Sequence, residues 1–218
     1  MRDAVIFDMD GLLLDSERIA NRTFIDTCTY FHVTYDAQLY AKCIGTNLTH
    51  TAQFLNANIV DFPKTAFMAH WNEAYVENAV KKPVPVKRGV FDFLTSLAAL
   101  NIPCAVATSS PMGNATAKLK NAGLIDYFSG IVFGDQVTAS KPHPEIYLKA
   151  AEKVGIKPEN CLALEDSDNG VRAAHAANML VFQIPDLLPP SADILTLGHD
   201  ILPSMDHAHQ RFIDALPD

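Results

Sequence analysis

Short apolar runs alternate with longer, helix-like segments over most of the chain. The runs have the length of strands and are rich in Val, Ile, Ala and Leu. The alternation predicts strands at about 102–107, 131–133, 161–164 and 180–184, and helices at about 90–100, 112–122, 144–154, 169–177 and 204–216. This order is typical of right-handed βαβ units. It predicts an α/β fold, with a Rossmann-like parallel sheet core and helices on both faces of the sheet.

The segment from about residue 17 to residue 82 differs from the rest, because it has helical patterns and no strong strand pattern. It ends in Lys81-Lys82-Pro83-Val84-Pro85, where the prolines break the helix. It begins soon after an apolar run at residues 5–7, which has the character of a buried strand. We therefore expect a discontinuous α/β core, residues 1–15 and 86–218, and an inserted helical segment, residues 16–85.

Two carboxylates, Asp8 and Asp10, follow the first apolar run directly. Residues i and i+2 of a strand point to the same side, so both should emerge together before Gly11 breaks the regular structure. Carboxylates crowded in this way repel each other unless one is protonated or a cation lies between them. The pair is suited to divalent-metal chemistry with a carboxylate nucleophile. The alternative is that both are ordinary residues at the end of a strand.

Polar residues also follow the later strands, where ligands bind in open α/β sheets. Thr108 and Ser109 come after the strand at 102–107, and a hydroxyl with the backbone N–H groups of a helix start can hold a phosphoryl oxygen. Simple capping of the next helix is the alternative. Lys141 precedes a proline, which favours an extended backbone outside the next helix. Its ammonium could hold a phosphoryl oxygen, or it could be an ordinary surface lysine in a loop.

A further acidic pair, Glu165 and Asp166, follows the strand at 161–164. Acids at this position could simply favour the positive end of the next helix. Ser167 or Asp168 could cap that helix, and Gly170 would allow the helix to approach the sheet closely.

These strand ends together resemble the four motifs of the haloacid dehalogenase superfamily. The matching strings are the apolar run with Asp8-Met9-Asp10-Gly11, then Thr108-Ser109, then Lys-Pro-x-Pro-Glu at 141–145, and Glu-Asp-Ser-x-x-Gly at 165–170. The continuation of the first motif, Leu-Leu-Leu-Asp-Ser-Glu at 12–17, resembles the branch that contains β-phosphoglucomutase and small sugar-phosphate phosphatases.

The resemblance implies a Mg²⁺-dependent phosphomonoester hydrolase that acts on a small phosphorylated metabolite. A sugar phosphate is one candidate for that metabolite. Asp8 would attack phosphorus to form an aspartyl-phosphate, and Asp10 would act as general acid and then as general base. Thr108 would supply the phosphate-binding hydroxyl and Ser109 its backbone N–H, and Ser109 as the hydroxyl is the one-residue alternative. Lys141 would hold a phosphoryl oxygen. The implied Mg²⁺ ligands are Asp8, the backbone carbonyl of Asp10, Asp166, and Glu165 through a water.

The resemblance implies that the inserted helical segment, residues 16–85, is a cap over the active site. Two positions in this helical cap favour the phosphatases over the mutases. The mutases carry a His shortly after the Asp-Ser/Thr element and an Arg three residues after a cap Gly, whereas this chain has Ala20 and Leu48 there. Dehalogenases need neither the second Asp nor a metal, so they fit less well. A β-phosphoglucomutase-like mutase stays open as an alternative. A non-catalytic phospho-acceptor module stays open too, although such receiver-like domains are shorter and lack the insertion.

The composition of the chain bears on its partners and on its location in the cell. The chain has 218 residues and a formal net charge of -8, which disfavours nucleic acid as a partner. No apolar run reaches the roughly 18 residues that a membrane span needs. The cysteines, Cys28, Cys43, Cys104 and Cys161, are scattered, with no CxxC pair, so we expect reduced, mostly buried thiols in a cytoplasmic protein. No targeting segment and no obligate protein partner is evident.

Overall fold

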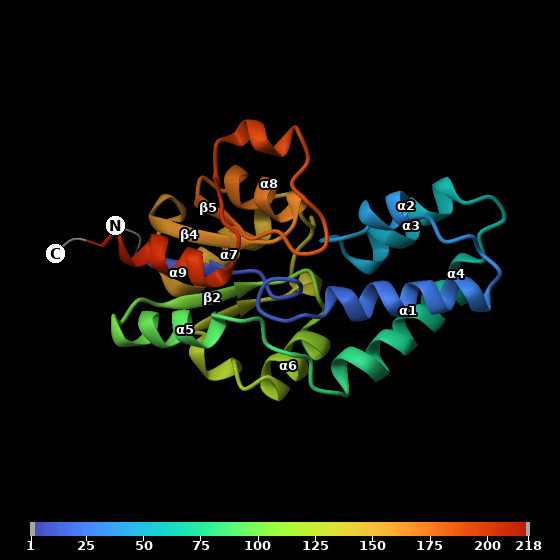
Figure 1. Ribbon diagram of the computed structural model, residues 1–218, viewed down its shortest axis with the longest axis horizontal. Coiled ribbons are helices and arrows are strands. Elements are labelled where there is room, and N and C mark those ends of the chain that lie inside the picture. Colours follow the sequence, from blue (N-terminus) through green and yellow to red (C-terminus); the bar gives the residue numbers. More distant parts are fainter. Residues whose placement is uncertain (1–2, 217–218) are drawn as a thin grey trace.

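The computed structural model describes residues 3–216 and has a six-stranded parallel sheet in the order β3-β2-β1-β4-β5-β6 (Figure 1). The predicted α/β fold is confirmed. The strands are β1 (Ala4–Phe7), β2 (Cys104–Ala107), β3 (Gly130–Val132), β4 (Cys161–Glu165), β5 (Leu180–Gln183) and β6 (Asp200–Ile201). The last strand was not predicted, because two residues are too short to show a period of alternation.

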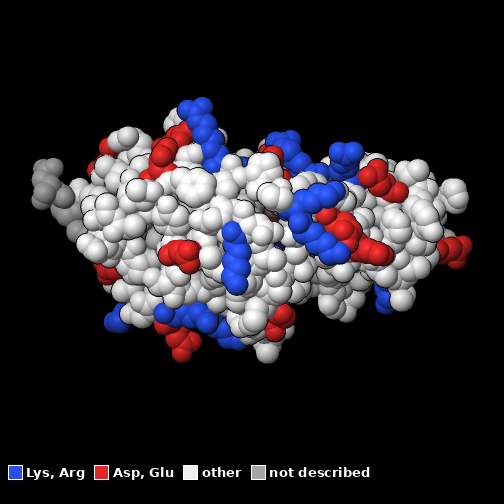
Figure 2. Space-filling view, turned by 90° about the horizontal axis from the view of Figure 1, so that it is seen from below, with Lys and Arg blue, Asp and Glu red and all other residues white. Residues whose placement is uncertain are grey.

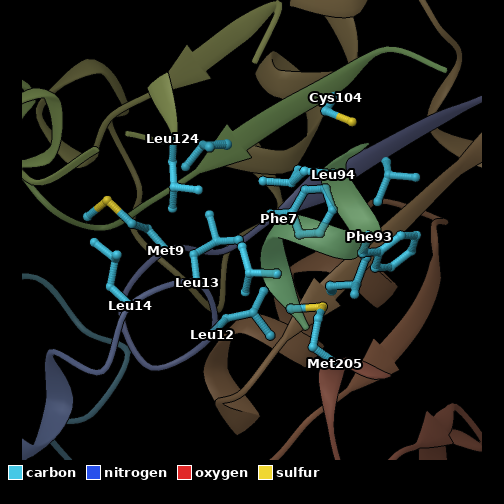
Figure 3. Close-up of a cluster of buried hydrophobic side chains, with 14 of the residues drawn as sticks. Phe7, Met9, Leu12, Leu13, Leu14, Phe93, Leu94, Cys104, Leu124 and Met205 are labelled. Atoms are coloured by element: carbon cyan, nitrogen blue, oxygen red, sulfur yellow. The ribbon is translucent and has the colours of Figure 1, made fainter. Parts of the chain in front are cut away.

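Helices cover both faces of the sheet because successive residues of each strand point to opposite sides. On one face, Val5 and Phe7 pack with apolar residues of α5 (Val90–Ala99), α6 (Met112–Asn121) and α9 (Met205–Ile213). Figure 3 shows part of this cluster, in which Phe7 lies beside Phe93 and Leu94. On the other face, Ala4 and Ile6 pack with α7 (Glu145–Val154) and α8 (Asp168–Ala176). All four cysteines are buried thiols.

The expected insertion folds as a group of helices at one end of the sheet (Figure 1). It contains α1 (Glu17–Tyr30), α2 (Ala37–Ala41), α3 (Leu48–Asn58), α4 (Lys64–Tyr75) and the π-helical turn η1 (Val76–Val80). These helices share their own apolar cluster, in which the ring of Phe24 lies 5.0 Å from that of Trp71. The two connections to the core run side by side, since Leu14 forms an antiparallel bridge with Val86.

Short 3-10 turns complete the chain at η2 (Ile125–Tyr127), η3 (Gly134–Gln136), η4 (Pro158–Asn160) and η5 (Ile194–Leu197). None of the helices within residues 3–216 is both long and apolar enough to cross a membrane. On the face seen in Figure 2, Lys and Arg lie among Asp and Glu rather than in one large patch.

Candidate active site

A cavity of about 130 Å³ lies between the carboxyl ends of the central strands and the helical segment. The register of the sheet explains which residues meet there. Phe7 pairs with Val106 on one side and with Leu164 on the other, so the residues that follow β1, β2 and β4 emerge next to one another. The core contributes Asp8, Asp10, Thr108, Ser109 and Asp166 to the lining, and the helical segment contributes Glu17, Ala20, Tyr40, Thr46, Leu48, Trp71, Asn72 and Tyr75, among others.

Lys141 joins two of the predicted carboxylates in the interior. Its ammonium donates hydrogen bonds of 2.5 Å to Asp8 Oδ1 and of 2.5 Å to Glu165 Oε1, and the side chain is only 3% exposed. Burial raises the pKa of Asp8 to about 7, with a contribution from Glu165, although Lys141 opposes the shift. Burial alone would lower the pKa of Lys141, but Asp8 and Glu165 raise it. The lysine is therefore a fixed cation beside Asp8, and it lies outside the following helix.

Asp8, Glu165 and Asp166 form a buried group in which one carboxylate oxygen from each residue lies within 4.8 Å of the other two. Burial, together with Asp8 and Glu165, raises the pKa of Asp166 well above its usual range. Glu165 is already engaged, since Oε1 also accepts a 2.6 Å hydrogen bond from Tyr147 and Oε2 accepts one of 3.1 Å from Ser167. A divalent cation would relieve the repulsion within this group, and carboxylate oxygens are ligands that Mg²⁺ prefers.

Two glycines allow the acids to come this close. Gly11 has a φ of +90°, and a Cβ at that position would lie 2.2 Å from Asp166 Oδ2. A Cβ at Gly170 would lie 1.9 Å from Glu165 Oε1. The expected close approach at Gly170 is thus present. Of the two candidate caps for α8, it is Ser167 that accepts the backbone N–H of Gly170, at 3.2 Å.

Asp10 points to a second lysine, Lys118 of α6, which the sequence analysis did not single out. Lys118 Nζ donates to Asp10 Oδ1 at 2.5 Å, and the Ser16 hydroxyl donates to the same oxygen at 2.5 Å. Ser110 donates to Oδ2 at 2.8 Å. Burial would raise the pKa of Asp10, but Lys118 and these hydroxyl donors lower it. Asp10 is consequently held as a carboxylate.

The two candidate hydroxyls after β2 have different surroundings. Thr108 is 1% exposed, lines the cavity, and its Oγ1 accepts the backbone N–H of Ser110 at 3.1 Å. Ser109 also lines the cavity, but its hydroxyl donates to the carbonyl of Gly45 at 3.3 Å. Thr108 is thus held by the core, whereas Ser109 connects the core to the helical segment.

Glu17 is another residue whose place in the site the sequence did not reveal. It lines the cavity from the first turn of α1, and burial, with Asp10 and Asp8 nearby, raises its pKa to about 8. The signal in the sequence was weak, because an acid in the first turn of a helix is common for reasons of helix electrostatics alone.

The residues at the two mutase-type positions, Ala20 and Leu48, both line the cavity. Among the described residues of this lining, none is a Lys or an Arg. Arg18 instead pairs with Asp15 at 3.2 Å, near the connection to the core. Lys42 and Arg172 line a neighbouring cavity of about 500 Å³, which shares Asp166 and Ser167 with the first cavity.

Comparisons with known proteins identify the family of this chain. A family model described as haloacid dehalogenase-like hydrolase matches residues 5–184. A phosphorylated carbohydrates phosphatase of Thermotoga maritima is 32% identical over 183 residues, which are 81% of this chain and 82% of that protein. The fructose-1-phosphate phosphatase YqaB of Escherichia coli is 31% identical over 176 residues, 80% of this chain and 92% of that one. A crystal structure of a CbbY mutant from Rhodobacter sphaeroides, in complex with xylulose-(1,5)bisphosphate, aligns with a TM-score of 0.76 at 27% identity and covers 94% of this chain and 96% of that one. The chain therefore belongs to the haloacid dehalogenase-like hydrolase family.

Proposed function

We propose that this protein is a Mg²⁺-dependent phosphatase that hydrolyses the monophosphate ester of a small, polyhydroxylated metabolite through an aspartyl-phosphate on Asp8. The observation that carries the proposal is the buried group of Asp8, Lys141, Glu165 and Asp166, of which Asp8 and Asp166 line the cavity. The substrate class is supported by the relatives, which are named as phosphatases of phosphorylated carbohydrates, of fructose 1-phosphate and of hexitols.

The reaction takes two steps on this chain's own residues. In the first, an Asp8 carboxylate oxygen forms a bond to phosphorus while the ester P–O bond breaks, and Asp10 gives a proton to the leaving oxygen. Asp10 must carry a proton for this step, although Lys118 and its hydroxyl donors favour the carboxylate form in this structure. In the second, water attacks phosphorus, the bond between phosphorus and Asp8 breaks, and Asp10 takes the proton of the water. Lys141 neutralises negative charge on the phosphoryl oxygens, and the Thr108 hydroxyl donates a hydrogen bond to one of them.

The donor set fits Mg²⁺, because three buried carboxylates face one another with only one lysine between two of them. Asp8, the backbone carbonyl of Asp10 and Asp166 would hold the ion, and Glu165, whose oxygens are engaged by Lys141, Tyr147 and Ser167, would act through a water. When bound, Mg²⁺ neutralises phosphoryl charge and the repulsion between the carboxylates.

The helical segment, residues 16–85, would act as a cap that excludes water and selects the substrate. Polar contacts join it to the core at the cavity edge: the Ser109 hydroxyl donates to the carbonyl of Gly45, and Asn169 donates to the carbonyl of Ile44 at 3.3 Å. Two adjacent connections, joined at Leu14 and Val86, are suited to a hinge.

The lining of the cavity favours a single phosphate. A second phosphate or a carboxylate on the substrate would need a cation, and the described lining supplies none, whereas Thr46, Thr51 and Asn72 offer groups that bind hydroxyls. A mutase remains the second candidate, because a phosphate could reach Lys42 and Arg172 in the neighbouring cavity and because the CbbY structure holds a bisphosphate.

The test combines a phosphatase assay with product analysis. Purified protein should release many equivalents of phosphate from p-nitrophenyl phosphate with Mg²⁺ and none after chelation; release of one equivalent or less would indicate a phospho-acceptor module. β-Glucose 1-phosphate with catalytic glucose 1,6-bisphosphate is then followed by phosphorus NMR. Glucose 6-phosphate that forms faster than inorganic phosphate would reject the phosphatase in favour of the mutase.

A further inference from the structure

Lys118 is a buried cation that neither step above uses. It lies on α6 and is 2% exposed. Its ammonium donates to Asp10 Oδ1 at 2.5 Å, to the Tyr75 hydroxyl at 2.9 Å and to the Ser110 hydroxyl at 3.3 Å. An ammonium has three protons to donate, so all three have acceptors here. A lysine is almost never buried without such partners, and these partners converge on Asp10.

The partners of Lys118 come from both parts of the molecule. Tyr75 ends α4 of the helical segment, and its hydroxyl also donates to Asp10 Oδ1 at 3.4 Å, while Ser110 follows β2 of the core and donates to Oδ2. Lys118 Nζ lies 5.3 Å from the centre of the Tyr75 ring. Lys118 is therefore held on several sides, and it in turn fixes one oxygen of Asp10.

Lys118 does not belong to the described lining of the cavity, whereas Asp10 does. A substrate in the cavity would therefore meet Asp10 and not Lys118. Any effect of Lys118 on the reaction must pass through Asp10, which separates it from Lys141, whose ammonium contacts Asp8 directly.

We propose that Lys118 is a positioning residue, which holds the carboxylate of Asp10 in the orientation that accepts the proton of the attacking water when the aspartyl-phosphate is hydrolysed. This inference rests on the proposed phosphatase function. A carboxylate that must receive a proton in a defined place loses much of its effect when it can rotate away, and a misplacement of about 1 Å can lower a rate about 100-fold. Ser16 and Ser110 would still contact Asp10 without Lys118, but hydroxyl donors alone are weaker than a charge-assisted bond.

The test is rapid-quench kinetics with p-nitrophenyl phosphate, a substrate whose leaving group needs no general acid. Lys118→Met should lower the steady-state rate at least tenfold and should show a burst of about one nitrophenol per enzyme, because the aspartyl-phosphate forms and then waits. Lys120→Met, an exposed lysine on the same helix, is the matched control and should stay within twofold of wild type. A Lys118→Met rate within twofold of wild type, or a tenfold loss without a burst, would overturn the assignment.

A double variant tests whether the effect passes through Asp10. In the Asp10→Asn background, adding Lys118→Met should change the slow phase by less than twofold, because the group that Lys118 positions is already gone. A further tenfold loss would show that Lys118 acts independently and would overturn the proposal. This pair also decides the matter if Lys118→Met alone does not fold, since the double variant leaves no unpaired charge. Absence of turnover by the wild type would instead reject the phosphatase function itself.

Discussion

Replacing Lys141 by Met should destabilise the folded, metal-free protein by about 3–5 kcal/mol. The ammonium is the shared partner of Asp8 and Glu165, at 2.5 Å from an oxygen of each, and all three side chains are buried. Met has a similar length and no charge. The variant would therefore leave two carboxylates in the interior without their cation, and breaking a buried pair from one side costs far more than the pair itself contributes.

Lys141→Met should also lower the melting temperature and the turnover number. For a chain of this size, 1 kcal/mol corresponds to roughly 2–4 °C, so the midpoint of unfolding should fall by about 6–20 °C. Mg²⁺ should raise the free energy of unfolding more in the variant than in the wild type, because a metal among Asp8, Glu165 and Asp166 would replace the lost cation. The turnover number should fall about 100- to 1,000-fold, since a charge that stabilises the phosphoryl oxygens is gone.

The assay is urea unfolding in the presence of a chelator and then of Mg²⁺, together with thermal melts. Lys149→Met is the matched control, because the Lys149 side chain is 40% exposed and its pair with Glu145 at 2.7 Å lies at the surface. That variant should lose less than about 1 kcal/mol. A Lys141→Met protein within 1 kcal/mol of wild type, both without metal, would refute the reasoning, since it would mean that Asp8 and Glu165 are not held as buried anions by this lysine.

Three further outcomes are expected. Asp8→Asn should abolish turnover and leave the protein folded, because an amide is a poor nucleophile of the same size and Lys141 keeps Glu165 as an anionic partner; turnover within tenfold of wild type would remove Asp8 from that role. Asp166→Ala should raise the Mg²⁺ concentration needed for half-maximal activity more than Glu165→Ala does, and a Mg²⁺ titration that gives the reverse order would exchange the two assignments. Glu17 has a pKa raised from about 4.5 to about 8, so the folded state favours its protonated form, and the stability that it contributes should be lost as the pH rises through that window. Urea unfolding at pH 5.5 and pH 8 should therefore show a smaller pH-dependent loss in Glu17→Gln than in wild type, and equal losses would contradict the raised pKa.

The sheet and the strand-end residues could be predicted because two local rules combine. Apolar runs locate buried strands, and in a parallel sheet all of the carboxyl ends lie at one edge, so Asp8, Thr108 and Asp166 had to lie near that edge. The observed pairing of Phe7 with Val106 and Leu164 brings these residues together. The sequence left Thr108 and Ser109 as alternatives, and the Ser109 hydroxyl, which donates to the carbonyl of Gly45, supports Thr108 as the proposed phosphate-binding hydroxyl.

Residues that act across the boundary of the two parts were not found from the sequence. A helical pattern gives the buried side of each helix, but it does not say which residues remain at a cavity between two groups of helices. Glu17 was therefore unassigned, and so were Trp71 and Asn72, which line the cavity from α4. The short strand β6, residues Asp200–Ile201, was missed for a different reason, since two residues are too few to show a period of alternation.

Lys118 shows that one such residue did leave a signal. Positions 115, 118, 119 and 122 form the i, i+3, i+4, i+7 stripe of α6, and Ala115, Leu119 and Ala122 are apolar as expected for the side that faces the core. A lysine at the remaining position breaks that stripe. Because an unpaired buried ammonium is so unfavourable, the break itself requires an anionic partner inside the fold. The structure shows that this partner is Asp10, whose Oδ1 accepts a 2.5 Å hydrogen bond from Lys118 Nζ, and we infer that this contact holds Asp10 in its proposed catalytic role.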